Sequence, residues 1–188
     1  MKPNPLSMLD LCAGMGGASA AMRERGWRVI SVELCADLNP DIVADVRDFH
    51  WTGERPDLVW ASPVCTEYSR LVKPASWAKG WKTPINPNPD QSLWKACERV
   101  IAECGPRYWI IENVCGAQRI HGKAACHFGS RYLWGSFPRI DAPPEYGKWR
   151  LPPSKDRARL RSKIPYTLSL GVCIAIESAI PFHEATAR

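Results

Sequence analysis

The sequence predicts an α/β fold built on a mostly parallel sheet. Short apolar segments alternate with segments of helical periodicity in the first third of the chain, and polar residues begin where each apolar segment ends. A length of 188 residues suits one domain, and no change in composition marks a boundary. We therefore expect a single domain over residues 1–188.

The first elements are expected to form a strand–helix–strand unit. Met8–Cys12 is short and apolar, a glycine cluster follows it, Ala18–Arg25 can form a helix, and Arg28–Leu34 is expected as the second strand. Asp41–Val46 and Asp57–Ser62 are expected to add two further strands. Because ligands of such sheets bind at the carboxyl ends of the strands, the residues just after these segments are candidates for a site.

A loop, a helix and a buried strand are expected next. Residues 73–89 hold prolines among tryptophans, lysines and glycine, which excludes regular structure and predicts a long loop beside the site. Asn88 is expected to cap the following helix, and Gly105 is expected to end it. Cys97 and Cys104 lie on the apolar stripe of that helix and are expected to pack in the core. Tyr108–Val114 is expected to form a buried strand.

The last elements are a hairpin and a helix. Ala124–Phe128 and Arg131–Phe137 are expected to pair through the turn at Gly129 and Ser130. Pro165–Ile180 is expected to be an amphipathic helix. Its apolar face would consist of Leu168, Val172, Ile176 and Ala179.

The net charge of +6 is concentrated in one segment. Residues 147–163 contain seven basic side chains and one acidic side chain, and in the rest of the chain the two signs cancel. This segment is expected to bind nucleic-acid phosphates, although a solvated basic loop would have the same composition. The chain has no apolar run of membrane-spanning length and no signal-peptide pattern. We expect a cytoplasmic protein.

The eight cysteines do not form paired motifs. The absence of a C-x-x-C pair favours reduced thiols over a disulfide framework. A metal-binding interaction module is an alternative that would have to use the cysteine and histidine side chains near the middle of the chain. Their gaps do not match the short paired spacings of zinc sites, so no metal is expected. These residues are Cys115, His121, Cys126 and His127.

Two pairs of features indicate a cofactor-binding site and a catalytic site. Asp10–Gly17 is a glycine-rich turn between a strand and a helix, and Glu33 ends the next strand, where an acid commonly accepts ribose hydroxyls. Cys65 lies just past another strand in a turn fixed by Pro63, which is a suitable place for a nucleophile. Glu112 follows an apolar run, so burial is expected to raise its pKa and leave it a proton to share.

These segments, with Asn113-Val114 and Ser69, resemble the ordered motifs of the DNA cytosine-5 methyltransferase family, most closely a compact, phage-associated branch. The resemblance implies a Rossmann-like class I S-adenosylmethionine-dependent methyltransferase fold, in a protein of a bacterium or a phage-infected host cell. It also implies a covalent cysteine mechanism that places a methyl group on carbon 5 of cytosine in DNA. The target base would be flipped out of the duplex or single-stranded.

The resemblance also implies a role for each matching residue. Cys65 would attack carbon 6 of cytosine, Glu112 would hold and protonate ring nitrogen 3, and Arg131 would contact the pyrimidine oxygen. Glu33 would bind the ribose of the cofactor, and Asp45 with Val46 would bind the adenine. The remaining cofactor-binding residues would be Asp10, Leu11, Cys12, Gly14, Gly16 and Pro63.

The chain departs from the family pattern in three places. Val64 replaces the second proline of the cysteine motif, and Ser130-Arg131-Tyr132 is a reduced form of the Gln-x-Arg-x-Arg motif. A separate target-recognition region is missing. The alternatives are methylation of tRNA, of a free nucleotide or of an exocyclic amine, and a catalytically inactive DNA-binding homologue.

Overall fold

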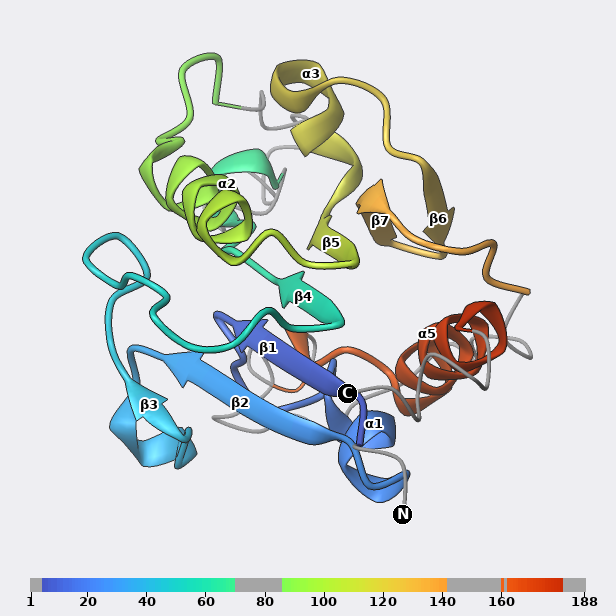
Figure 1. Ribbon diagram of the computed structural model, residues 1–188. Coiled ribbons are helices and arrows are strands. Elements are labelled where there is room, and N and C mark those ends of the chain that lie inside the picture. Colours follow the sequence, from blue (N-terminus) through green and yellow to red (C-terminus); the bar gives the residue numbers. More distant parts are fainter. Residues whose placement is uncertain (1–4, 70–85, 142–159, 161, 181–188) are drawn as a thin grey trace.

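The computed structural model describes residues 5–69, 86–141, 160 and 162–180. These residues form a seven-stranded sheet with the strand order β3-β2-β1-β4-β5-β7-β6 (Figure 1). Within this part of the chain, no helix combines the length and the apolar character that crossing a membrane requires.

Five strands run parallel, as predicted from the sequence. The expected hairpin is also present, because β6 pairs antiparallel with β7, and β7 pairs antiparallel with β5. The sheet is therefore Rossmann-like and mostly parallel, which confirms the predicted fold class. The strands are β1 (Ser7–Leu11), β2 (Arg28–Glu33), β3 (Ile42–Val43), β4 (Leu58–Ala61), β5 (Tyr108–Asn113), β6 (Cys126–Phe128) and β7 (Arg131–Ser136).

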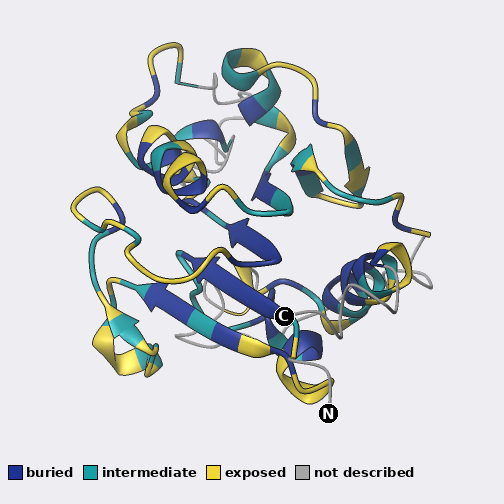
Figure 2. Ribbon diagram, in the orientation of Figure 1, coloured by how far each residue is buried: buried dark blue, intermediate teal, exposed yellow. Residues whose placement is uncertain are grey.

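Helices cover both faces of the sheet. Helices α1 (Ala20–Glu24) and α5 (Tyr166–Ala179) lie together on one face, and α2 (Ser92–Cys104) lies on the other (Figure 1). Alternate side chains of each strand enter two different cores: Met8 packs with α1 and α5, whereas Leu9 packs with α2. This explains why β1 and β4 are buried at every position (Figure 2).

Helix α2 begins later than predicted. Its first residue is Ser92, and Asp90 accepts hydrogen bonds from the Ser92 backbone N–H at 2.8 Å and the Ser92 hydroxyl at 3.0 Å. The prediction of Asn88 as the cap is wrong, because the Asn88 backbone N–H is turned back to Asn86 Oδ1 at 3.0 Å. The helix ends as predicted, at Gly105 in the left-handed conformation. Cys97 and Cys104 are buried, as expected.

Strand β3 and helix α5 also differ in extent from the prediction. Strand β3 is reduced to Ile42–Val43, because it pairs only with β2 at the edge of the sheet. On α5 the predicted residues Leu168, Val172 and Ile176 are buried, but Ala179 is exposed. The helix ends at Ala179, and the next residue, Ile180, enters the core instead. All eight cysteines are free thiols.

Candidate active site

The strand order reverses direction between β1 and β4. Strands β2 and β3 lie to one side of β1, whereas β4 and β5 lie to the other side, so the connections leave in opposite directions. The turns after the two central strands touch, because the Ser62 backbone N–H donates to the Leu11 carbonyl at 3.0 Å. The glycine-rich turn and the cysteine turn therefore lie side by side at the carboxyl edge of the sheet.

The glycine-rich turn has open space beside it. Gly14 and Gly16 have φ angles of +53° and +65°, a conformation that residues with side chains rarely adopt. A Cβ atom built on either glycine would meet no heavy atom within 4 Å. Gly17 is the opposite case, because its Cβ would lie 2.5 Å from the Ile164 carbonyl oxygen. The turn is thus packed against the chain before α5 at one end and open at Gly14 and Gly16.

Glu33 connects the glycine-rich turn to the end of β2. Its Oε2 accepts the Gly14 backbone N–H at 2.9 Å, and its Oε1 accepts the Cys35 backbone N–H at 3.0 Å. Each carboxylate oxygen can accept a further hydrogen bond, and the residue is only partly buried. This fixed carboxylate beside an open turn can accept hydrogen bonds from the vicinal hydroxyls of a ribose.

Asp10 lies beneath the turn and not on its open side. The residue is 0% exposed, and among the described residues neither carboxyl oxygen has a hydrogen-bond partner. Burial raises the pKa of Asp10 to about 7, so a large fraction of this carboxyl carries a proton at neutral pH. Leu11 is also 0% exposed, so of the turn residues expected to bind the cofactor, Cys12, Gly14 and Gly16 are the accessible ones.

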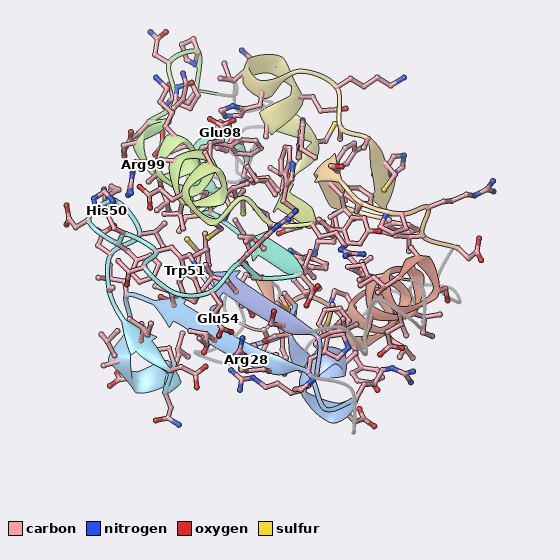
Figure 3. All side chains as sticks on the ribbon, viewed as in Figure 1. Arg28, His50, Trp51, Glu54, Glu98 and Arg99 are labelled. Atoms are coloured by element: carbon pink, nitrogen blue, oxygen red, sulfur yellow. The ribbon has the colours of Figure 1, made fainter. Side chains whose placement is uncertain are left out.

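The loop after β3 is held onto α2 by Arg99. One guanidinium nitrogen, Nη2, donates to the carbonyls of Val46 at 3.0 Å and Phe49 at 2.9 Å, while Nη1 donates to Glu103 Oε1 at 2.6 Å. Figure 3 shows Arg99 beside His50 of this loop. Nothing in the local sequence indicates this contact, because Arg99 follows its carbonyl partners by about 50 residues.

Asp45 and Val46 begin this loop. Val46 is buried at 3% exposure, and the Asp45 carboxylate is paired with Arg47 at 2.6 Å. Hydrogen bonds from Arg47 hold the pKa of Asp45 below its usual value. An adenine amino group that used Asp45 would therefore have to share the carboxylate with Arg47.

The cysteine turn is tied to β5 by a buried amide. Asn113 Nδ2 donates to the Pro63 carbonyl at 2.9 Å, and Asn113 Oδ1 accepts the Val114 backbone N–H at 2.9 Å. Asn113 is only 1% exposed, so this link is shielded from water. The turn that contains Pro63 and Cys65 is thereby held at the edge where Glu112 ends its strand.

Glu112 and Arg131 form a nearly buried ion pair next to this turn. Arg131 Nη1 lies 3.3 Å from Glu112 Oε1, and the two side chains are 14% and 6% exposed. They meet because β5 pairs with β7, which places Glu112 opposite Leu133. Burial raises the pKa of Glu112, although the charge of Arg131 and a hydrogen bond from Ser62 act against this rise. Arg131 Nη2 also donates to the Lys163 carbonyl at 3.1 Å.

The Cys65 thiol shares the electrostatic environment of this pair. The residue is half-buried, and burial together with the charge of Glu112 raises the pKa of the thiol, while Arg131 lowers it. In this state Cys65 is a thiol at neutral pH. When Glu112 carries a proton it has no negative charge, and only burial then raises the pKa of Cys65. Protonation of Glu112 therefore favours ionisation of Cys65.

The structure thus brings Cys65, Glu112 and Arg131 together and places Gly14, Gly16 and Glu33 on the adjoining turn. Sequence reasoning gave no role to Ser62, Asn113 or Arg99. Most of the expected loop and basic segment, at positions 70–85, 142–159 and 161, lies outside the described residues.

Within the described part of the chain, no metal centre is found at this site, and the cavity that the structure shows lies elsewhere. Among the described residues, no three His, Cys, Asp or Glu side chains are grouped so that they could hold a metal ion, and His121 is instead hydrogen-bonded to Tyr68. A cavity of about 430 Å³ opens at the opposite, amino-terminal edge of the sheet. It is lined by Pro5, Ser7, Arg28, Glu54, Arg55, Pro56 and Arg107.

The chain is similar to a protein of Frog virus 3 (isolate Goorha) named as a probable DNA (cytosine-5)-methyltransferase. The two are 29% identical over 118 residues, which cover 57% of this chain and 53% of the relative. The chain thus spans about half the length of the curated relative it matches. No protein-family model matches it. The relative bears the name of the family that the motifs resemble, and the predicted resemblance is therefore confirmed.

Two solved structures show weaker likeness. One is a prophage-encoded E. coli protein described as a DNA modification methyltransferase, with a TM-score of 0.45 and 20% identity over 62% of this chain and 34% of that chain. The other is an S-adenosylmethionine-dependent methyltransferase from Mesorhizobium loti, with a TM-score of 0.37 and 16% identity over 61% of this chain and 48% of that chain. The fold assignment rests on the sheet topology itself.

Proposed function

We propose that this protein is an S-adenosylmethionine-dependent DNA methyltransferase that methylates carbon 5 of cytosine through a covalent adduct with Cys65. The observation that carries the proposal is the convergence of Cys65 with the Glu112–Arg131 pair at the carboxyl edge of the sheet. A nucleophilic sulfur, a carboxyl with a raised pKa and a cation are the groups that addition to an electron-poor ring requires.

The open side of the glycine-rich turn fits S-adenosylmethionine. Glu33 presents a fixed carboxylate for the ribose hydroxyls, and Gly14 and Gly16 leave room where any side chain would intrude. Cys12 follows β1 and Pro63, which is buried, follows β4, so both lie at the carboxyl edge of the sheet, while Asp45 and Val46 belong to the loop expected at the adenine. When bound there, the cofactor supplies an electrophilic methyl group.

The residues of the chain then account for the remaining steps. Cys65 gives its proton to water and its sulfur bonds to carbon 6, while Glu112 donates a proton to ring nitrogen 3 and so neutralises the negative charge that the addition pushes into the ring. Carbon 5 becomes nucleophilic and takes the methyl group. Loss of the carbon 5 proton to a base restores the ring double bond and expels Cys65, and the nitrogen 3 proton returns to Glu112.

Arg131 has two supporting roles in this proposal. Its guanidinium keeps Glu112 in place at 3.3 Å and offers further donors for the exocyclic oxygen of the pyrimidine. Its charge also lowers the pKa of the Cys65 thiol. The hydrogen bonds of Arg131 therefore act on Glu112 and the pyrimidine, and its charge acts on the Cys65 thiol.

DNA is the substrate that the family resemblance and the Frog virus 3 relative favour. The reacting atoms of cytosine are inaccessible in a stacked duplex, so the base must be flipped or single-stranded. We assign phosphate contacts to the basic segment 147–163 and a position beside the base to the loop 73–89, both on sequence grounds.

Methyl transfer from labelled S-adenosylmethionine tests the proposal. The protein is incubated with duplex DNA, single-stranded DNA, tRNA or free nucleotides, and the products are digested to nucleosides. Label in 5-methylcytosine from DNA is the expected result. Label in tRNA, in a free nucleotide or on an exocyclic amine would replace the proposed substrate, and no transfer with retained DNA binding would indicate an inactive homologue.

Trapping tests the covalent step. DNA that contains 5-fluorocytosine cannot lose fluorine as a proton, so the wild-type protein should stay attached to it under denaturing conditions. Cys65→Ser should abolish this adduct. Cys115→Ser is the matched control, because Cys115 is an exposed thiol, and it should leave the adduct intact. An adduct that survives Cys65→Ser would assign the nucleophile to another residue.

A further inference from the structure

Four rings form a cluster next to the cysteine turn, in which His121 is half-buried and the other three rings are buried. Tyr68 lies in the 3-10 turn η2 (Thr66–Tyr68), Trp94 in α2, His121 in helix α3 (Gln118–His121), and Trp134 in β7. Tyr68 and Trp94 are 3% and 2% exposed, and Trp134 is 7% exposed. The reaction steps assigned above use none of these side chains.

His121 is the centre of the cluster. Its ring stacks on Trp94 with a centroid distance of 3.7 Å and an interplanar angle of 7°. Its Nε2 lies 2.9 Å from the Tyr68 hydroxyl, with which it forms a hydrogen bond. Burial lowers the pKa of His121, so the ring is neutral at neutral pH and its unprotonated nitrogen can accept the Tyr68 proton.

The surroundings hold His121 in this position. Trp94 Nε1 donates to Glu98 Oε1 at 2.8 Å, and Glu98 is visible on α2 in Figure 3. Trp134 packs edge-on against Trp94, and its Nε1 donates to the Gly122 carbonyl at 2.9 Å, directly after His121. The imidazole is therefore fixed by stacking on Trp94 and by the backbone that follows it.

Tyr68 connects the cluster to the nucleophile. The Tyr68 backbone N–H donates to the Cys65 carbonyl at 3.1 Å, so the ring of Tyr68 and the thiol of Cys65 belong to one turn. The other side of that turn is held by Asn113 at the Pro63 carbonyl. Cys65 is thus placed between two anchors, one on β5 and one on α3.

We propose that His121 is a positioning residue that fixes Cys65 for attack by holding the hydroxyl of Tyr68. The inference rests on the proposed function of Cys65. Small displacements of a nucleophile from its attack geometry cost large factors in rate, and the partly buried hydrogen bond between Tyr68 and His121 resists such displacement.

Tyr68→Phe is the decisive variant, because it removes only the hydroxyl and keeps the ring that packs against Trp94. His121→Gln is its counterpart on α3. His127→Gln is the matched control, because His127 is an exposed histidine on β6 that stacks on Tyr132 at 4.7 Å. The measured quantities are the rate of adduct formation with 5-fluorocytosine DNA in a single turnover and the dissociation constants for DNA and S-adenosylmethionine.

Loss of the hydrogen bond between Tyr68 and His121 corresponds to about a three- to tenfold change in the rate of adduct formation. We expect Tyr68→Phe and His121→Gln to slow adduct formation by this factor with both dissociation constants unchanged, and His127→Gln to match the wild type. Equal rates for Tyr68→Phe and the wild type, or a loss confined to the dissociation constants, would overturn the inference.

A second readout needs no substrate. The rate at which iodoacetamide alkylates Cys65, followed on its peptide by mass spectrometry, reports how firmly the half-buried thiol is held. We expect Tyr68→Phe to raise this rate several-fold over His127→Gln. If the wild type forms no adduct, the proposed function fails, while the alkylation rates still decide whether Tyr68 and His121 position Cys65. Equal alkylation rates would then contradict the inference.

Discussion

Replacing Arg99 with methionine is expected to weaken both the fold and cofactor binding. Methionine keeps an unbranched apolar stem but loses every donor of the guanidinium. The lost hydrogen bonds are those to the carbonyls of Val46, Arg47 and Phe49, at 3.0, 3.2 and 2.9 Å, and to Glu103 at 2.6 Å. Without the guanidinium, the loop after β3 loses the donor that these three carbonyls share.

The magnitude follows from these contacts and their exposure. A hydrogen bond that involves a charged group is worth about 1.5 to 3 kcal/mol when it is shielded. Arg99 is 32% exposed, so water can replace part of what is lost. We expect the free energy of unfolding to fall by about 2 kcal/mol. If the loop is then ordered only on binding, S-adenosylmethionine affinity should fall by about tenfold, which corresponds to about 1.4 kcal/mol.

Urea denaturation measures the first quantity and isothermal calorimetry the second. Arg28→Met is the matched control, because Arg28 pairs with Glu54 at the other edge of the sheet, and these two side chains are 56% and 77% exposed (Figure 3). It should change neither quantity measurably. Equal stability of the two variants would refute the role of Arg99 in holding the loop. Unchanged S-adenosylmethionine affinity in Arg99→Met would show that this loop does not contribute to cofactor binding.

Two further predictions concern buried and hydrogen-bonded carboxyls. The raised pKa of Asp10, about 7, means that the native state keeps a proton that the unfolded chain releases near pH 4, so stability should fall as pH rises from about 4 to 7. Asp10→Asn should flatten this part of the profile of urea midpoint against pH, and parallel profiles for the two proteins would contradict the assignment. Glu33→Ala should weaken S-adenosylmethionine binding by about ten- to a hundredfold, since a charged acceptor contributes about 1.5 to 3 kcal/mol. Unchanged calorimetric affinity would remove Glu33 from the cofactor site.

Local sequence was a good guide to the strands and a poorer one to helix starts. Strands β2, β4 and β5 lie within the predicted ranges and β1 begins one residue earlier than predicted, because their apolar runs are bounded by polar residues and turns. The start of α2 was misplaced because Asn86, Asn88 and Asp90 all can turn the backbone, and their side chains compete for neighbouring N–H groups. Such competition is settled by packing of the whole segment, which no single residue determines.

The sequence by itself determined which chemical groups follow which strand. Cys65 comes after β4 and Glu112 lies at the carboxyl end of β5, just before Asn113, wherever the strands lie in the sheet, and this order also carries the family resemblance. The tertiary structure decided which of these groups meet. Arg131 reaches Glu112 because β7 inserts beside β5, and the Asn113 link to Pro63 exists because β4 and β5 are neighbours.

The contacts that fix the site join residues far apart in the chain. Arg99 and Val46 are 53 positions apart, as are Tyr68 and His121. Periodicity and turn chemistry act over a few residues, so they predict elements but not the partners of those elements. The partners are set by strand order and by the packing of α2 and α3, where burial of apolar surface over the whole molecule selects one arrangement.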